Sequence, residues 1–307
     1  MSAPAAAHRP VLADEVAFLL RPRGGWRPRG GWVVDGTVGL GGHAERILEV
    51  ADASTRLLGI DADPEALRRA GERLARFRDR VVLRQGSFRR LAAHAGDAGV
   101  TSAAAVLLDL GVSSYQLDEC GRGFSFQREE PLDMRLDPTQ GATAAELLNA
   151  LSADELARIL LEHGQEIHAR RIARRIHERR ARGAPLRTTG DLVAAVKAGV
   201  PRRAWPRRTH VATRTFQAVR IAVNDEAAAL AAALPQAADL LDGGGRLGVI
   251  AFHSGEDRIV KRAFRALAPA GYVSLEPAPI TPTRDEVRDN PRARSAKLRV
   301  LERLEAA

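Results

Sequence analysis

The sequence predicts an α/β protein whose parallel sheet is interrupted by a long helical insertion. Short apolar runs alternate with helical segments through residues 33–109, and apolar runs return from residue 246. Between these regions, residues 143–200 carry helical signals without a convincing strand. Short apolar strands separated by helices are typical of a parallel sheet that is covered on both faces.

The first part of the sheet is predicted by four apolar runs. In chain order these are Val33-Val34, Arg56–Ile60, Val81–Leu83 and Ala104–Leu108. A helix is expected from His43 to about Val50. Another is expected to start at Asp63-Pro64-Glu65, where an N-cap acid precedes a proline at the first helical position.

Three later runs complete the predicted sheet. They are Arg246–Phe252, Tyr272–Leu275 and Lys297–Leu301. The simplest division of the chain assigns residues 1–114 and 214–307 to one α/β domain. Residues 115–213 then form an inserted helical domain.

The composition bounds the possible functions. The 307 residues include 47 Lys or Arg and 38 Asp or Glu, a net charge of +9, which favours a polyanionic partner. Cys120 is the only cysteine, which excludes a disulfide within the chain and a four-cysteine metal site. No stretch is apolar enough over a sufficient length to cross a bilayer, and no targeting segment is recognised. We therefore expect a cytoplasmic protein without a metal site or membrane contact.

A glycine-rich turn after the first strand indicates a cofactor site. Residues 35–43 read DGTVGLGGH and lead into a helix. Glycines allow the backbone to turn tightly and to approach a ligand, and the helix N-terminus offers free amide groups. Asp61, at the end of the next strand, is placed to accept hydrogen bonds from both ribose hydroxyls of an adenosine cofactor. An acid that ends the first strand itself favours S-adenosylmethionine over NAD, and a glycine-rich turn without a ligand is the structural alternative.

Two further loops follow predicted strands. Phe88, in Gln85-Gly86-Ser87-Phe88, is expected either to lie against an adenine ring or to pack in the core. Asp109 begins the polar loop DLGVSS, where Ser113 and Ser114 either belong to a catalytic loop or cap a helix.

One segment accounts for the positive charge of the chain. Residues 152–220 contain 16 Lys or Arg and 6 Asp or Glu. Two basic runs there are predicted to bind RNA, as a helical stripe and as a loop in which an aromatic ring could stack on a base. Their residues are Arg171, Arg175, Arg179, Arg202, Arg203, Trp205, Arg207 and Arg208. A solvated helix face is the alternative for either run taken alone.

Several long motifs carry a resemblance to a known family. They are DGTVGLGGHAERIL, LLDLGVSS, QLD, RGFSF, PLDMRLDP, ATRTFQAVRIAVN, AFHSGEDRIVK and NPRARSAKLRV. Through them, from His8 to about Glu302, the chain resembles the RsmH (MraW) family of bacterial 16S ribosomal RNA cytosine-N4 methyltransferases. The hexamer RPRGGW occurs twice in tandem, at Arg21–Trp26 and Arg27–Trp32. One copy looks like an insertion, and the duplication is expected to lengthen a surface loop.

The resemblance implies a Rossmann-like class I methyltransferase domain with an inserted helical domain. It also implies S-adenosyl-L-methionine as the methyl donor and 16S rRNA, within the small ribosomal subunit, as the partner. The cofactor contacts that it implies are Gly41, Gly42, His43, Asp61, Phe88, Asp109 and Gln116.

Transfer to a cytosine amine favours an acceptor for the amine protons. The candidate catalytic residues are Asp109, Ser113 and Ser114, whereas for His253 a structural hydrogen-bonding role is favoured. Two alternatives come from other classes of protein. One is a noncatalytic RNA-binding or ribosome-assembly factor that keeps a nucleotide pocket, and the other is an NAD-dependent oxidoreductase.

Overall fold

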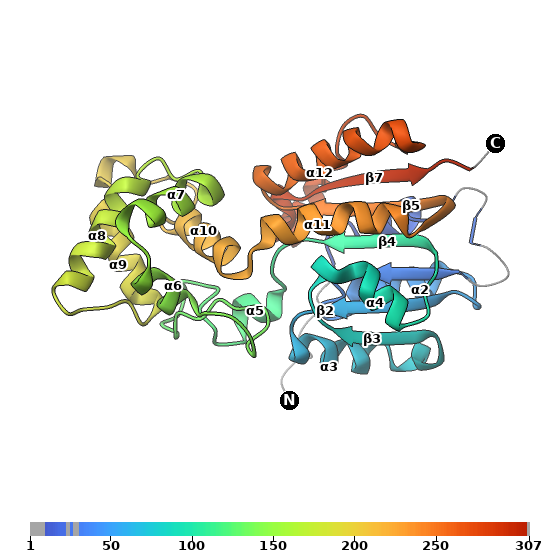
Figure 1. The fold of residues 1–307 in the computed structure, drawn as a ribbon, viewed down its shortest axis with the longest axis horizontal. Coiled ribbons are helices and arrows are strands. Elements are labelled where there is room, and N and C mark those ends of the chain that lie inside the picture. Colours follow the sequence, from blue (N-terminus) through green and yellow to red (C-terminus); the bar gives the residue numbers. More distant parts are fainter. Residues whose placement is uncertain (1–9, 23–24, 27–30, 306–307) are drawn as a thin grey trace. The chain divides into compact units, whose positions relative to one another are not determined.

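The computed structural model describes residues 10–22, 25–26 and 31–305. The chain divides into two compact units (Figure 1). Unit 1 comprises Met1–Gly111 and Ala227–Ala307, and unit 2 comprises Val112–Glu226. Unit 2 extends beyond residues 115–213 at both ends. The hexamers Arg21–Trp26 and Arg27–Trp32 lie partly outside the described residues, so a lengthened surface loop there stays a prediction.

Unit 1 is built on a sheet that has seven strands in the described part of the chain, in the order β3-β2-β1-β4-β5-β7-β6 (Figure 1). Strands β1 to β5 pair in parallel, and β7 is antiparallel to both β5 and β6. The strands are β1 (Trp32–Asp35), β2 (Arg56–Asp61), β3 (Val81–Gln85), β4 (Ala103–Asp109), β5 (Leu241–Ala251), β6 (Tyr272–Ser274) and β7 (Lys297–Arg303). Each strand expected from the sequence is present, and the predicted Rossmann-like α/β sheet is confirmed.

The strand order reverses between β1 and β4. From β1 the chain crosses to β2 and then β3 on one side, whereas β4 and β5 extend the sheet on the other side. Val33, Val34 and Asp35 of β1 pair with β2 and with β4 along their length. Ligands of open α/β sheets bind outside the carboxyl ends of the strands at such a reversal. The topology therefore places a binding site at the carboxyl ends of β1 and β4.

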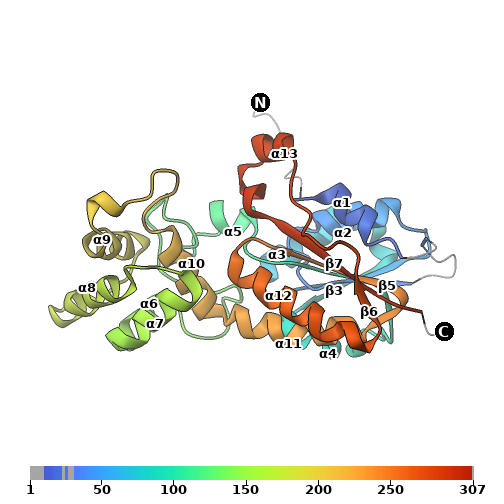
Figure 2. The same ribbon diagram turned by 90° about the horizontal axis from the view of Figure 1, so that it is seen from above.

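Helices cover both faces of the sheet (Figure 2). One face packs against α1 (Ala13–Leu19), α2 (Gly42–Val50) and α3 (Pro64–Arg73). The other packs against α4 (Leu91–Asp97), α11 (Glu226–Asp239) and α12 (Ser254–Leu267). The remaining elements of unit 1 are α13 (Arg284–Asp289) and the 3-10 helices η1 (Ala75–Arg80), η2 (Phe88–Arg90), η4 (Ala268–Ala270) and η5 (Pro291–Ser295).

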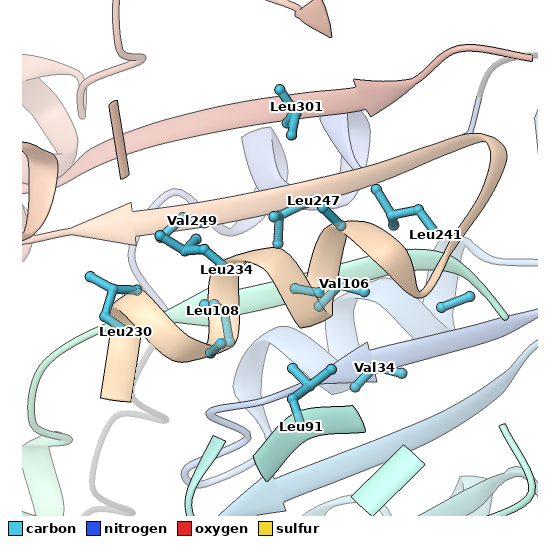
Figure 3. Packing of buried hydrophobic residues seen from close by; sticks show 14 of the residues in the cluster. Val34, Leu91, Val106, Leu108, Leu230, Leu234, Leu241, Leu247, Val249 and Leu301 are labelled. Atoms are coloured by element: carbon cyan, nitrogen blue, oxygen red, sulfur yellow. The ribbon is translucent and has the colours of Figure 1, made fainter. Parts of the chain in front are cut away.

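Alternate residues of the central strands face opposite helical layers. Val106 and Leu108 of β4 lie in the buried cluster under α11, where Leu230 and Leu234 meet them (Figure 3). Leu107, between them in the sequence, lies in the cluster on the opposite face. This is the two-residue period of a strand whose faces are both buried, and it explains why the run is apolar throughout.

Unit 2 has its own buried core and is built of helices. They are α5 (Ser114–Asp118), α6 (Ala144–Ala150), α7 (Ala153–Gly164), α8 (Ala169–Ala181), α9 (Thr189–Gly199), η3 (Arg202–Ala204) and α10 (Thr213–Asn224). Capping boxes start α5, α6, α7 and α9. In each, the Ser or Thr side chain accepts from the backbone N–H three residues on, and its own backbone N–H donates to the side chain of that later residue. The helix starts are thus set by local sequence, and the packing of the apolar faces holds the unit together.

Candidate active site

Three aspartates end neighbouring parallel strands at one edge of the sheet. Asp35 ends β1, Asp61 ends β2 and Asp109 ends β4. Because β1 lies between β2 and β4, the three carboxyl groups gather beside the reversal of strand order. The sequence placed all three at strand ends, and the sheet brings them to one edge.

The turn after β1 is hydrogen-bonded to all three of these strand ends. The Thr37 N–H donates to Asp35 Oδ1 at 3.1 Å, and the Gly39 N–H donates to Asp61 Oδ2 at 2.8 Å. The Asp109 N–H donates to the Thr37 hydroxyl at 2.6 Å. The Asp63 N–H completes the set by donating to Asp61 Oδ1 at 2.9 Å. The glycine-rich turn is therefore held in place by the carboxyl edge.

Two of the carboxyl groups have raised pKa values. The Asp35 side chain is 1% exposed, and burial raises its pKa to about 7, against the opposing effects of His43 and the Thr37 N–H. Asp61 keeps part of its surface exposed, and desolvation raises its pKa to about 6 although three backbone N–H groups favour the carboxylate. Both groups thus have too little positive charge nearby to offset desolvation.

His43 and Asp109 leave polar atoms available at the same edge. His43, the second residue of α2, is 6% exposed, and its Nε2 lies 3.4 Å from Asp109 Oδ2. Within the described residues, neither ring nitrogen of His43 nor Asp109 Oδ1 has a hydrogen-bond partner. A buried polar atom without a partner costs about 1–3 kcal/mol. These atoms and the desolvated carboxyl groups fit a ligand that brings positive charge and hydrogen-bonding groups.

Gly41 is required by backbone conformation and by packing. Its φ is +80°, and a Cβ added there would lie 3.3 Å from Leu74 Cγ and 3.4 Å from Ala70 Cα, both in the α3 region. A side chain at this position would meet α3, so the close approach that the glycine allows is between helices. Gly42 is the first residue of α2, and its role toward a cofactor stays a prediction.

Phe88 packs in part against the core. It begins η2 and lies half-buried against the cluster on the α4, α11 and α12 face. The ring therefore packs partly in the core, which is one of the two expected roles, and its contact with an adenine stays a prediction.

Ser113, Ser114 and Gln116 lie in unit 2, where two of them start α5. The Gln116 N–H donates to Ser113 Oγ at 3.2 Å, and the Ser113 N–H donates to Gln116 Oε1 at 2.9 Å. Gln116 is 6% exposed, and Ser114 is the first residue of the helix. Ser113 thus caps α5, which is the structural alternative expected for this pair of serines. Catalytic and cofactor roles for the three residues stay predictions.

His253 is the N-cap of α12. The Glu256 N–H donates to His253 Nδ1 at 3.3 Å, and His253 Nε2 lies 3.1 Å from Glu256 Oε1. Glu256 Oε2 in turn accepts from the backbone of Phe252 at 2.8 Å. This is the structural role that the sequence favoured.

The predicted α8 stripe combines exposed and engaged arginines. Arg171 is exposed, whereas Arg175 Nη1 lies 2.8 Å from Glu178 Oε2. Arg179 pairs with Asp191 of α9, and its Nε donates to the Ala184 carbonyl at 3.1 Å. Arg179 thus ties the end of α8 to the start of α9.

In the basic loop, Trp205 is held by its neighbours. Its Nε1–H donates to the Val200 carbonyl at 3.1 Å, and the Arg202 guanidinium lies 4.4 Å from the ring centroid. The ring also packs against the core of unit 2. Arg202, Arg203, Arg207 and Arg208 are all exposed. The exposed arginines are the residues of this loop that keep their charge at the surface.

Sequence reasoning did not assign Asp35 or Thr37 to the site. Asp35 was visible as an acid that ends a strand, but its burial depends on the tertiary fold. Thr37 carries no local signal, because its hydroxyl gains its role from the Asp109 backbone, distant in sequence.

The described residues contain no group of three or more His, Cys, Asp or Glu that could hold a metal ion. No helix in the same part of the chain is long and apolar enough to cross a membrane.

Comparisons with known proteins cover nearly the whole chain. The MraW methylase family is matched over residues 5–304. The chain is similar to proteins named ribosomal RNA small subunit methyltransferase H. With that of Syntrophotalea carbinolica it shares 47% identity, over 97% of this chain and 98% of the relative. With that of Heliobacterium modesticaldum it shares 45%, over 97% and 98%, and with that of Acidothermus cellulolyticus 46%, over 98% and 95%. This chain belongs to the MraW methylase family.

Proposed function

We propose that this chain is an S-adenosyl-L-methionine-dependent methyltransferase that methylates the N4 amine of a cytidine in 16S rRNA, within the small ribosomal subunit and in the cytoplasm. Membership of the MraW methylase family and the names of its relatives support the reaction class and the RNA. The structural observation that carries the proposal is the cluster of Asp35, Asp61 and Asp109 beside His43. Among the described residues, no Lys or Arg forms an ion pair with these carboxyl groups, and the cofactor carries a positive charge.

The residues of this edge fit the parts of the cofactor. Asp61 would accept hydrogen bonds from the ribose hydroxyls, and Phe88 would lie beside the adenine. His43 and Asp109 would face the methionine end, where an ammonium group offers donors to a carboxylate. Gly41, Gly42 and, from unit 2, Gln116 complete the proposed set. When bound, the cofactor supplies a methyl group that its sulfonium already activates.

The remaining task of the protein is to hold the acceptor amine in line and to receive its proton. Cytosine N4 is a weak nucleophile, because its lone pair is delocalised into the ring. A hydrogen-bond acceptor on its protons localises that pair and takes the proton released on transfer. Asp109 and the backbone of Ser113 and Ser114 are the proposed acceptors. The target base must be unstacked to reach such a site.

Unit 2 is the proposed RNA-binding domain, with residues 115–213 as its centre. Its support is the excess of cations in residues 152–220 together with the exposure of Arg171, Arg203, Arg207 and Arg208. Arginines of this kind hold phosphates without reading sequence. Arg175, Arg179, Arg202 and Trp205 belong to the same two basic runs and also have partners within the unit.

The test is transfer to RNA followed by identification of the product. The purified protein is incubated with methyl-labelled S-adenosylmethionine and either naked 16S rRNA or small subunits. The RNA is then digested and its nucleosides are analysed by mass spectrometry. We expect label in N4-methylcytidine. Label in another nucleoside would overturn the acceptor. A folded protein that binds cofactor and RNA without transfer would be a noncatalytic factor.

A further inference from the structure

Four cations lie on the outward face of α12 in unit 1. They follow the spacing i, i+3, i+4 and i+7, which places them on one side of a helix. All four are exposed, whereas Val260 and Phe264 on the opposite side are buried in the core. The α12 cation face consists of Arg258, Lys261, Arg262 and Arg265.

The acids of α12 do not neutralise this face. Glu256 is 6% exposed and serves the N-terminal capping box with His253. Asp257 binds Arg299 Nε at 2.7 Å and lies 3.4 Å from Lys297 Nζ, both in β7. In the described part of the chain, no ion pair or hydrogen bond joins a side chain of the α12 cation face to a partner. The helix thus turns its acids inward and its cations outward.

On another helix of the same unit, α3, the arginines form ion pairs with neighbouring acids. On α3, Arg68 pairs with Glu65 at 2.7 Å and also with Glu72, and Arg69 pairs with Glu65 at 2.9 Å. The neighbouring Arg76 pairs with Glu49. Those arginines are solvated members of a balanced network. The α12 cation face has no such balance.

Helix polarity does not account for the four cations. A cation is favoured by the helix dipole in the last turn only, and Arg265 is the basic residue there. Arg258 lies one turn from the N-terminus, where the dipole gives a cation no support. Like charges at i, i+4, such as Arg258 and Arg262, repel by a few tenths of a kcal/mol. Neither helix polarity nor pairing within the described residues therefore accounts for the four cations.

We propose that the α12 cation face binds the phosphodiester backbone of the RNA substrate. The inference rests on the proposed function, and it adds a surface of unit 1 that the motifs did not indicate. α12 starts directly after β5, at the carboxyl edge that also carries Asp35 and Asp109. The four residues span about 10 Å along the helix axis. A strand of RNA held along this face runs toward the edge at which the methyl group would be transferred.

The chemistry of the face favours nucleic acid over a membrane surface. A helix that lies on a membrane inserts an apolar face beside its cations. The large apolar residues of α12 that are buried, Val260 and Phe264, are committed to the core of unit 1. Arginine and lysine without an apolar neighbour to insert are suited to phosphate oxygens.

The test replaces the four cations and compares the result with an equal change elsewhere in unit 1. The test variant is Arg258→Gln, Lys261→Gln, Arg262→Gln and Arg265→Gln. The control is Arg46→Gln, Arg68→Gln, Arg69→Gln and Arg76→Gln, which removes the same charge from ion-paired arginines of the α2 and α3 region. Binding to a fluorescent 16S rRNA fragment is measured from 50 to 200 mM salt, beside cofactor calorimetry and thermal unfolding.

We expect the test variant to bind RNA about tenfold or more weakly, with a salt dependence flattened by about 0.7–0.9 log units per lost phosphate contact. Cofactor affinity should be unchanged, and the control should keep wild-type RNA affinity within about twofold. The double variants Arg258→Gln with Arg262→Gln, and Lys261→Gln with Arg265→Gln, should each show part of the loss. If the quadruple variant fails to fold, the two double variants still test the proposal.

The outcomes separate this surface from the proposed function. If the wild-type protein binds and methylates RNA and the test variant matches it in RNA affinity and salt slope, RNA binding by the α12 cation face is overturned and the proposed function stands. A wild-type protein that neither binds nor methylates RNA overturns the proposed function together with the surface. Binding to vesicles of anionic lipid that the variant loses, with RNA binding kept, would assign the face to a membrane.

Discussion

At the carboxyl edge of unit 1, Asp109 combines a fixed backbone with a free oxygen. Its N–H donates to the Thr37 hydroxyl at 2.6 Å, and its Oδ2 lies 3.4 Å from His43 Nε2. Oδ1 has no hydrogen-bond partner among the residues that the structure describes. The carboxylate therefore keeps an acceptor for a ligand while its position is set by the turn. Two proposed roles, toward the cofactor ammonium and toward the substrate amine, compete for that acceptor.

Kinetics of Asp109→Ala separate the two roles. We expect the larger effect to be a raised dissociation constant for S-adenosylmethionine, with much of the rate restored at saturating cofactor. Calorimetry and single-turnover transfer measure the two quantities. Near-wild-type affinity with a rate deficit of roughly 10²–10⁴ at saturation would instead assign Asp109 to the amine proton.

Asp61→Ala is expected to weaken cofactor binding, because it removes the acceptor proposed for the ribose hydroxyls. Hydrogen bonds to a charged group are worth about 1.5–3 kcal/mol. Asp61 also accepts from Gly39 and Asp63, so Asp61→Asn, which keeps one acceptor oxygen, is the matched comparison. Unchanged affinity in a folded Asp61→Ala protein would remove the ribose assignment.

Asp35→Asn is expected to stabilise the protein more as pH rises. Burial raises the pKa of Asp35 from 3.8 to about 7, so the folded state binds this proton more tightly than the unfolded chain. The stability it contributes is full below about pH 4 and is lost as pH rises through about 7. Urea unfolding at about pH 5 and pH 8 should show the variant gaining roughly 2–3 kcal/mol on wild type, which is the part of the full effect of about 4 kcal/mol that falls in this interval. A pH-independent difference would contradict the burial of a titrating group.

At the scale of elements, the junction of α2 with α3 depends on Gly41. We expect Gly41→Val to lower the free energy of unfolding by about 2 kcal/mol or more, from the left-handed backbone and from contact with Leu74. It should weaken cofactor binding as well. Gly99→Val is the control, because Gly99 has φ +72° and nothing within 4 Å of an added Cβ. Equal losses of stability in the two variants would show that packing against α3 contributes nothing.

Within α8, the structure divides the predicted stripe by role. Arg171→Gln should weaken RNA binding without a change in stability, because its side chain is exposed. Arg179→Gln should lower the free energy of unfolding by about 1 kcal/mol, since it loses Asp191 and the Ala184 carbonyl. Denaturant unfolding and RNA titration of both variants measure the division. RNA affinity and salt slope that survive Arg171→Gln would make this end of the stripe a solvated face.

At the scale of the whole molecule, cofactor binding should be linked to proton release. A ligand that brings positive charge favours the ionised forms of Asp35 and Asp61, whose pKa values are raised to about 7 and about 6. Binding then expels protons below about pH 7, and affinity increases as pH rises from about 5 to 7.5. Calorimetry in buffers of different ionisation enthalpy counts the protons. Constant affinity over that interval would show that neither carboxyl group faces the cation.

Local patterns in the sequence determined much of the fold and the outline of the site. The apolar runs located the strands, because a strand buried on both faces must be apolar over its whole length. Asp35, Asp61 and Asp109 were visible as acids that follow those runs, and Asp63-Pro64-Glu65 marked a helix start that α3 confirms. Such signals depend on residues within a strand or a helical turn. The chain itself therefore carries them without reference to distant partners.

Tertiary structure decided everything that depends on residues distant in sequence. The raised pKa of Asp35 follows from its burial in the fold, which outweighs the opposing charge of His43 in α2. The requirement for glycine at position 41 follows from the nearby Leu74 of the α3 region, and Arg179 is engaged by Asp191 of α9. The unbalanced cations of α12 emerged in the same way, because the sequence does not show that Asp257 is taken by Arg299. Ion pairing, burial and hydrogen bonding depend on which residues lie next to one another, and the tertiary fold determines those neighbours.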